Sequence, residues 1–198
     1  MHTNSKLLFA KYGKPFFRPS SRVLEIGPDA SPSSYQSLVN DRTITWETTD
    51  IASRDGITYP NASEYSFPVP DEGYDVVLTG QVIEHVKKIW VWIRELERVC
   101  KKGGYVIIIN PVSWPFHEVP VDCWRIYPDG MKALLEDTSL RILESRFESL
   151  ESPGHKRYLP GVSLEFQTPK MRLFYRLAGM IGLPVERAYD TITIAQKG

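Results

Sequence analysis

The chain has 198 residues, of which 42% are hydrophobic and 12% aromatic, enough to form one sizeable core. Its 24 Lys and Arg balance 24 Asp and Glu, so it lacks the basic excess typical of nucleic-acid-binding proteins. No apolar run approaches the length of a membrane span, and the N-terminal segment lacks the plan of a signal peptide. We expect a single domain over residues 1–198 in a soluble, cytoplasmic protein without a nucleic-acid partner. Cys100 and Cys123 are expected to be reduced thiols.

Residues 1–21 carry aromatic and aliphatic side chains among Lys and Ser. This composition predicts a short leading helix followed by an extended aromatic segment that ends at Pro19. We expect an N-terminal arm, which either packs against the domain or covers the edge of a ligand crevice.

The next segment predicts a buried strand that ends in a tight turn and leads into a helix. Val23 and Ile26 belong to a short apolar run, Gly27 allows a sharp turn, and Ser31–Pro32 is typical of a helix start. A short helix is predicted over residues 33–39. Where a parallel strand meets a helix, free backbone N–H groups face a crevice that commonly binds nucleosides. A plain strand-turn-helix connection explains the same residues.

A second strand is predicted over residues 44–50 because this run is rich in β-branched residues. Asp50 stands at its end, 23 positions after Gly27. In nucleotide-binding sheets, a carboxylate at this place accepts hydrogen bonds from both ribose hydroxyls. The pairing of Asp50 with the Gly27 turn therefore favours a nucleoside-containing ligand.

The rest of the chain predicts strands alternating with helices. The expected strands are 56–59, which is brief, 74–80, 105–109, 140–150 and 191–195, and the expected helices are 88–101, 128–136 and 170–181. Residues 105–109 are apolar on both faces, which is typical of a parallel sheet covered by helices on each side. Residues 151–185 are expected to form an insertion or cover before the last strand.

Polar and aromatic residues crowd the segment 112–127, which follows a central strand where such sheets build active sites. His117 is a candidate general base, since imidazole titrates near neutral pH, although simple packing explains it too. Asp122 either orients His117 or is the base, and Arg125 either binds an anionic group or pairs with Asp122. Cys123 lacks the features of a nucleophile turn, and no cluster in the sequence has metal-ligand spacing.

Four stretches in this order resemble the class I S-adenosylmethionine-dependent methyltransferases. They are Val23–Gly27, Thr49–Asp50, Tyr74–Leu78 with Glu84–Val86, and Glu95–Val99 with Lys102–Gly104. The later run His117–Pro128 resembles the small-molecule and sugar-modifying branch of that family.

The resemblance implies an α/β, three-layer Rossmann-like fold whose seven-stranded sheet is mostly parallel with an antiparallel last strand. It also implies S-adenosyl-L-methionine as cofactor and S-adenosyl-L-homocysteine as product. By residue, it implies that Glu25 and Gly27 border the methionine end, Asp50 holds the ribose and Ile51 packs on adenine. Asn61 and Ala62 are placed at the adenine edge, Gln81 beside the sulfonium, and His85 as a support of the site.

One departure from the family concerns the turn after Gly27, where further glycines are usual and Pro28-Asp29-Ala30 stands here. Pro28 removes one backbone donor at the cofactor site. Asp29 is then expected to supply any left-handed conformation that a glycine would give.

These observations predict a methyltransferase that acts on an oxygen, or less favourably a nitrogen, of a small molecule or sugar precursor. The Asn-Pro-Pro-aromatic signature of enzymes that methylate nucleic-acid amino groups is absent after Asn110-Pro111. Five basic residues against one acidic residue in 153–176 suit a phosphate-bearing acceptor, or simply a solvated surface. The alternatives are a nicotinamide-dependent oxidoreductase and a non-catalytic nucleoside-binding domain of the same fold. We expect a monomer or a homodimer.

Overall fold

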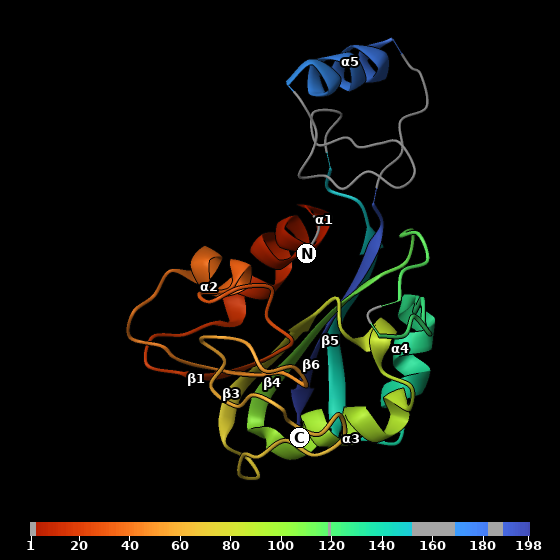
Figure 1. Cartoon of the computed structure of the whole chain (residues 1–198). Helices are drawn as coiled ribbons and strands as arrows, with labels where there is room; N and C mark the ends of the chain where they lie inside the picture. The colour runs from red at the N-terminus through yellow and green to blue at the C-terminus, as the bar shows by residue number, and fades with distance from the viewer. Residues whose placement is uncertain (1–2, 119, 152–168, 182–187) are drawn as a thin grey trace.

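The computed structural model describes residues 3–118, 120–151, 169–181 and 188–198, and its central feature is one β-sheet (Figure 1). Within these residues the strands are β1 (Arg22–Ile26), β2 (Thr45–Thr49), β3 (Tyr74–Gly80), β4 (Cys100–Pro111), β5 (Leu140–Glu148) and β6 (Asp190–Lys197). The helices are α1 (Thr3–Leu8), the π-helical turn η1 (Phe9–Gly13), the 3-10 turns η2 (Lys14–Phe16) and η3 (Ile83–His85), α2 (Ser34–Val39), α3 (Ile89–Val99), α4 (Pro128–Leu135) and α5 (Pro169–Met180).

The strands lie in the order β2-β1-β3-β4-β6-β5. β1 pairs in parallel with β2 and β3, β3 pairs in parallel with β4, and β6 runs antiparallel to both β4 and β5. This confirms the predicted mostly parallel sheet with a reversed last strand. Because β1 is flanked by β2 on one side and β3 on the other, the connections diverge at its carboxyl end, where open α/β sheets bind ligands.

Six strands form the sheet in the described residues, and the brief strand predicted at 56–59 is not among them. Tyr59 makes only an isolated parallel bridge with Thr49 at the end of β2. Gly56, with φ +81°, turns the chain just before it, and Pro60 cannot continue a ladder. Too few residues remain between these two positions for a strand.

Side chains on the central strands alternate between two cores, one on each face of the sheet. Leu24 and Val77 belong to the core covered by α3 and α4, whereas Val76 and Leu78 belong to the core covered by α1, η1 and α2. This arrangement confirms the predicted three layers, because strands that are apolar on both faces need helices on each side.

Three predicted boundaries are wrong. Residues 14–16 are helical rather than extended. The helix predicted over 33–39 is present as α2, but Ser33 rather than Ser31 caps it. α3 ends at Val99, although the sequence predicts a helix to Lys101, because Cys100 pairs with Tyr74 and begins β4.

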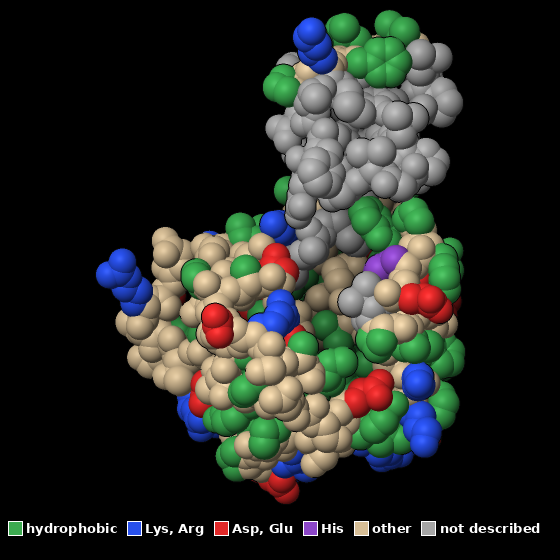
Figure 2. Space-filling view, in the orientation of Figure 1, with side chains coloured by type: hydrophobic (Ala, Val, Ile, Leu, Met, Phe, Trp, Pro, Cys, Tyr) green, Lys and Arg blue, Asp and Glu red, His purple; other side chains and the backbone are tan. Residues whose placement is uncertain are grey.

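α5 coincides with the helix predicted at 170–181, and most of the predicted insertion at 151–185 lies outside the described residues. Five apolar side chains of this segment are more than half exposed, namely Leu173, Phe174, Leu177, Met180 and Ile181. Figure 2 shows hydrophobic side chains at the surface in the region that α5 occupies in Figure 1. Among the described residues, none of the helices is long and apolar enough to span a membrane. Cys100 and Cys123 are both free thiols.

Candidate functional site

The turn after β1 depends on Gly27. This residue has φ +66°, and a Cβ there would lie 2.5 Å from Cγ2 of Val82. Its N–H donates to the carbonyl oxygen of Thr49 at 2.9 Å, which joins the ends of β1 and β2. A side chain at this position would be strained by the backbone conformation and would collide with Val82, the residue just before η3. The turn therefore requires glycine.

Asp29 does not take the left-handed conformation predicted for it. Within this turn only Gly27 has a positive φ. The carboxylate of Asp29 instead accepts hydrogen bonds from the N–H and the hydroxyl of Ser34, at 2.8 and 2.6 Å. Asp29 therefore binds the first residue of α2, and its negative charge is favourable at the positive, N-terminal end of the helix dipole.

A pocket of about 440 Å³, its open mouth included, lies between this turn and η3. The structure brings five of the predicted cofactor residues into its wall, namely Gly27, Asp50, Ile51, Ala62 and His85. Apolar side chains from both sides of the crevice form most of the remainder, namely Ile26, Phe67, Val82, Val86 and Trp92. A narrow apolar slot with a carboxylate at one end suits a purine ring attached to a ribose.

Asp50 lies at the carboxyl end of β2, and both of its carboxylate oxygens have protein partners. Oδ1 accepts a hydrogen bond from the N–H of Ala52 at 2.8 Å, and Oδ2 pairs with the guanidinium of Arg54. Arg54 also donates to the carbonyl oxygen of Pro28 at 2.7 Å. Arg54 therefore links Asp50, at the end of β2, to the turn after β1.

The other predicted cofactor residues are placed differently, and Glu25 does not line the pocket. Its carboxylate is buried beneath the turn, where Oε2 accepts hydrogen bonds from Ser33 (2.6 Å) and Trp46 (2.8 Å). Burial raises the pKa of Glu25 to about 7. Glu25 thus connects α2 to β1 and β2 through these two hydrogen bonds.

Pro28, Asn61 and Gln81 lie beside the pocket rather than in its wall. Asn61 has φ +53° and positions Ala62, whose N–H donates to the carbonyl oxygen of Asp50 at 2.9 Å. The Gln81 amide donates to Asp190 at 3.3 Å, at the carboxyl end of β3. A larger hollow lies at the amino ends of β1, β3 and β4, at the other end of the strands, and Arg18, Asp75 and Tyr105 are among the residues that line it.

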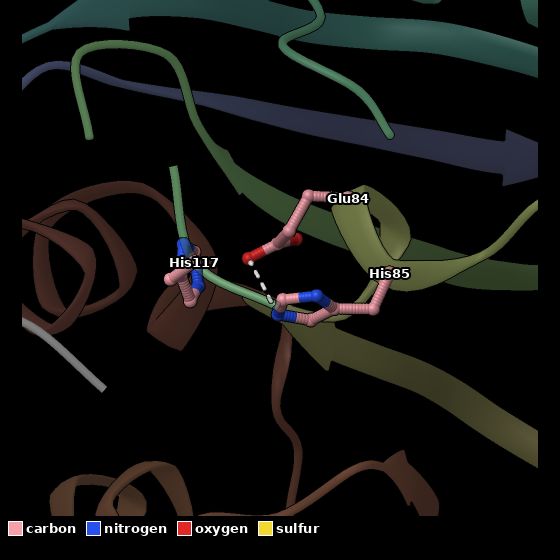
Figure 3. Close-up of side chains that lie close together, drawn as sticks. All are labelled: Glu84, His85 and His117. Carbon is pink, nitrogen blue, oxygen red and sulfur yellow. Dashed lines mark ion pairs between the residues drawn. The ribbon is translucent and has the colours of Figure 1, made fainter. Parts of the chain in front are cut away.

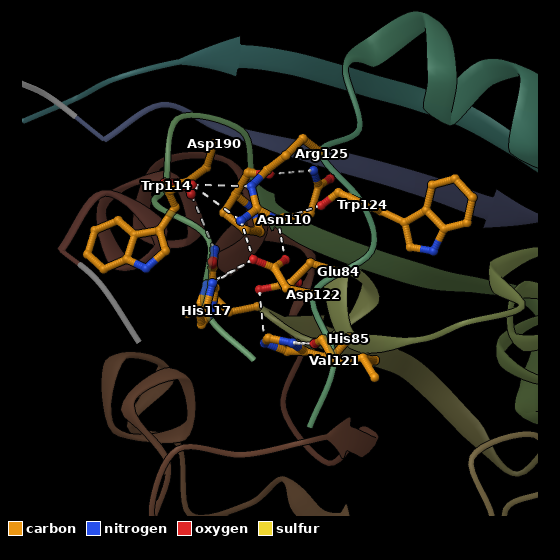
Figure 4. Close-up of polar contacts among 12 residues, drawn as sticks. Glu84, His85, Asn110, Trp114, His117, Val121, Asp122, Trp124, Arg125 and Asp190 are labelled. Atoms are coloured by element: carbon orange, nitrogen blue, oxygen red, sulfur yellow. Dashed lines mark hydrogen bonds and ion pairs between the residues drawn. The ribbon is translucent and has the colours of Figure 1, made fainter. Parts of the chain in front are cut away.

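Three predicted residues in the segment after β4 form one hydrogen-bonded group (Figure 4). The guanidinium of Arg125 donates to both carboxylate oxygens of Asp122, at 2.5 and 2.7 Å. The backbone N–H of His117 donates to the same carboxylate at 2.8 Å. These hydrogen bonds, led by those from Arg125, hold the pKa of Asp122 at about 2. Both carboxylate oxygens of Asp122 are therefore engaged, one of them with the backbone of His117.

His85 links the pocket to this group. Its ring packs edge-on against that of His117, with centroids 4.9 Å apart and an interplanar angle of 87°. Nδ1 of His85 lies 2.5 Å from the carbonyl oxygen of Val121, and burial lowers the pKa of His85. Nδ1 of His117 lies 3.1 Å from the carbonyl oxygen of Pro115 and 3.4 Å from Asp122 Oδ2.

Glu84 is a site residue to which the sequence analysis assigned no role. Its side chain is fully buried, neither carboxylate oxygen has a hydrogen-bond partner among the described residues, and burial raises its pKa to about 8. Oε1 lies 3.7 Å from Nε2 of His85 (Figure 3). The signal was present in the apolar run Val82–Val86, because a single acidic residue in such a run predicts a buried carboxylate.

Residues 26–108 match the family model described as a methyltransferase domain. An uncharacterized methyltransferase of Schizosaccharomyces pombe is 30% identical over 96 residues, which is 48% of this chain and 33% of that protein. The chain thus spans about a third of the length of the curated relatives it matches.

The fold is similar to solved structures along nearly the whole chain. A SAM-dependent methyltransferase from Archaeoglobus fulgidus superposes with a TM-score of 0.62 at 20% identity, covering 97% of this chain and 92% of that one. The [4+2]-cyclase SpnF has the same TM-score at 17% identity, covering 98% and 80%. The sequence match over residues 26–108 and the Rossmann-like fold make this chain similar to methyltransferase domains.

Proposed function

We propose that the protein transfers a methyl group from S-adenosylmethionine to a hydroxyl oxygen of a small molecule or a sugar precursor. The observation that carries this proposal is the contact between His85 and His117, with ring centroids 4.9 Å apart. His85 lines the pocket that holds Asp50, and His117 belongs to the group fixed by Asp122 and Arg125. A cofactor in the pocket and an acceptor beside His117 would meet at this contact.

Methyl transfer requires alignment of the acceptor oxygen with the sulfonium methyl group, and good alignment is worth roughly 7–11 kcal/mol at best. A hydroxyl must also lose its proton as the new C–O bond forms. His117 is the proposed acceptor of that proton through Nε2, because Nδ1 faces the Pro115 carbonyl and Asp122. Asp122 and Arg125 hold the imidazole in this orientation.

We further propose that Asp50 binds the ribose hydroxyls, that Ile51 and Ala62 contact the adenine, and that Gln81 lies near the sulfonium. The Ala62 N–H donates to the carbonyl oxygen of Asp50, which holds the proposed ribose and adenine contacts next to each other. Gly27 and Pro28 bring the turn after β1 over the methionine end of the cofactor.

A phosphate-bearing acceptor is supported by the basic residues of 153–176, of which Lys170 is exposed at the start of α5. Lys156 and Arg157 lie outside the described residues. The two free thiols support a reducing compartment, and we place the protein in the cytoplasm.

The first test is calorimetric titration of the protein with S-adenosylmethionine and S-adenosylhomocysteine, with NADH as a control ligand. Asp50→Ala is expected to weaken both sulfur cofactors roughly ten- to a hundredfold, because it removes hydrogen bonds to a charged group. Asp55→Ala, at an exposed carboxylate on the same loop, is the matched control and should bind normally. A preference for NADH would favour an oxidoreductase instead.

The second test is mass-spectrometric detection of methyl ether products from hydroxylated sugars and sugar phosphates. His117→Ala should abolish transfer while S-adenosylhomocysteine still binds. Cofactor binding without transfer to any hydroxyl or amine would favour a non-catalytic domain.

A further inference from the structure

Three side chains converge beside the cofactor pocket. Glu84 and His85 come from η3, and His117 comes from the segment after β4 (Figure 3). One carboxylate oxygen and two imidazole nitrogens lie within 4.8 Å of one another. We propose that Glu84, His85 and His117 bind one divalent transition-metal cation of the Zn²⁺ type.

The two histidines are held in the tautomer that such a site needs. Nδ1 of His85 is 2.5 Å from the Val121 carbonyl oxygen, and Nδ1 of His117 is 3.1 Å from the Pro115 carbonyl oxygen. A carbonyl only accepts hydrogen bonds, so Nδ1 of each ring carries the proton and Nε2 carries the lone pair. Metal-binding histidines are commonly oriented in this way, with the other ring nitrogen donating to a carbonyl or carboxylate.

Glu84 provides an independent indication of a missing partner. A fully buried carboxylate is normally paired or hydrogen-bonded, yet both oxygens of Glu84 lack a hydrogen-bond partner among the described residues. Arg125, the nearby cation, is already paired with Asp122. A cation between Glu84 and the two histidines would supply the charge that this carboxylate needs.

The donor set and its size fit a catalytic rather than a structural metal site. Two histidines and one glutamate form a set found in catalytic zinc sites, where a fourth position stays open for water or substrate. With metal–ligand distances near 2.0–2.1 Å, tetrahedral ligand atoms lie about 3.4 Å apart. Oε1 of Glu84 and Nε2 of His85 are 3.7 Å apart already. A small rotation of the partly exposed His117 ring would complete the site.

This inference rests on the proposed function only for the place of the acceptor. A hydroxyl in the fourth coordination position would be polarised by the cation and become more acidic. In the metal-loaded protein its proton would pass to water, and His117 would act as a ligand rather than as the proton acceptor. The methyl group would move from the sulfonium to this oxygen, leaving the neutral thioether.

The test uses the whole chain, stripped with a chelator and titrated with Co²⁺ and with Zn²⁺ by calorimetry and visible absorption. We expect one equivalent to bind, with at least tenfold weaker binding in His117→Ala and in Glu84→Gln. Cys123→Ser is the matched control, because an exposed thiol also captures these ions, and it should bind like the parent. S-adenosylhomocysteine binding, measured on each variant, shows that it remains folded.

No cobalt binding, or equal affinity in the parent and in His117→Ala, would overturn the metal site. That result would leave the proposed function untouched if methyl transfer proceeds after chelation. Tight cobalt binding that His117→Ala abolishes would support the site even if every hydroxyl acceptor fails, and in that case the proposed acceptor class alone would be wrong.

Discussion

Arg54 pairs with Asp50, the residue proposed to bind the ribose, and thereby occupies the carboxylate before any ligand arrives. The Arg54 side chain is 44% exposed and also donates to the Pro28 carbonyl, whereas the Asp50 side chain is 11% exposed. An ion pair with one solvent-exposed partner is worth roughly 0–1 kcal/mol, so a ribose that makes charged hydrogen bonds to Asp50 can displace the guanidinium of Arg54.

We therefore expect Arg54→Gln to strengthen S-adenosylmethionine binding two- to fivefold, because the cofactor no longer displaces an ion pair worth at most about 1 kcal/mol. Calorimetry at two salt concentrations measures this, and the gain should shrink at high salt, which already screens the pair. Weaker binding in Arg54→Gln would show that the guanidinium contacts the cofactor instead.

Gly27→Ala should destabilise the protein by roughly 2–4 kcal/mol, since it combines a left-handed backbone with a steric clash. Val82→Ala in the same chain removes the clashing methyl group and should restore only the steric part. Urea unfolding of the two single variants and the double variant separates these effects. Full recovery in the double variant would mean that the backbone conformation costs nothing.

Glu25 should make stability depend on pH. Its folded pKa of about 7 lies above the ordinary value of 4.5, so the folded state holds the proton more tightly. The resulting stabilisation is fully present below about pH 4.5 and is lost as the pH rises through 7. Because Ser33 and Trp46 both donate to one oxygen, Glu25→Gln preserves their acceptor.

Urea unfolding between pH 5 and pH 8 should show the parent losing up to roughly 3 kcal/mol relative to Glu25→Gln. Parallel pH profiles for the two proteins would show that Glu25 titrates normally in the folded state.

Arg125→Met should cost about 3 kcal/mol of stability, because it leaves the buried carboxylate of Asp122 without its partner. Adding Asp122→Asn should recover much of this loss, whereas methyl transfer should stay low in both variants because His117 is no longer held. Lys132→Met is the matched control, since it breaks an exposed pair with Asp129 and should change stability by less than about 0.5 kcal/mol. Equal losses of unfolding free energy in Arg125→Met and Lys132→Met would contradict the prediction that the buried ion pair matters more than the exposed one.

The parallel sheet and the position of its crevice were predictable, because short stretches of the sequence determine both. The apolar run at 105–109 and the spacing of Gly27 and Asp50 led to the parallel sheet and to its crevice. The sequence predicts that the turn needs glycine at position 27, but it does not predict that Val82 packs against this glycine. The strand expected at 56–59 failed because pairing depends on how many residues remain between two turns, which propensity does not measure.

The roles of buried charges were the least predictable part of the site. A motif predicts that Glu25 borders the cofactor, and that motif does not reveal the hydrogen bonds that its carboxylate accepts from Ser33 and Trp46 beneath the turn. Glu84 and His117 are 33 positions apart in the chain, so no local spacing could reveal that they meet. Side-chain direction and long-range contact decide these roles, and both arise only in the folded chain.

The position of β6 has a consequence for how the protein is made. This strand follows all the others along the chain, yet it lies between β4 and β5 and pairs with both. On the ribosome, β1 to β4 can associate early, but β5 has no neighbour in the sheet until residues 190–197 emerge. Until then β4 presents an open, strongly apolar edge, which is the state most exposed to aggregation and to chaperone capture.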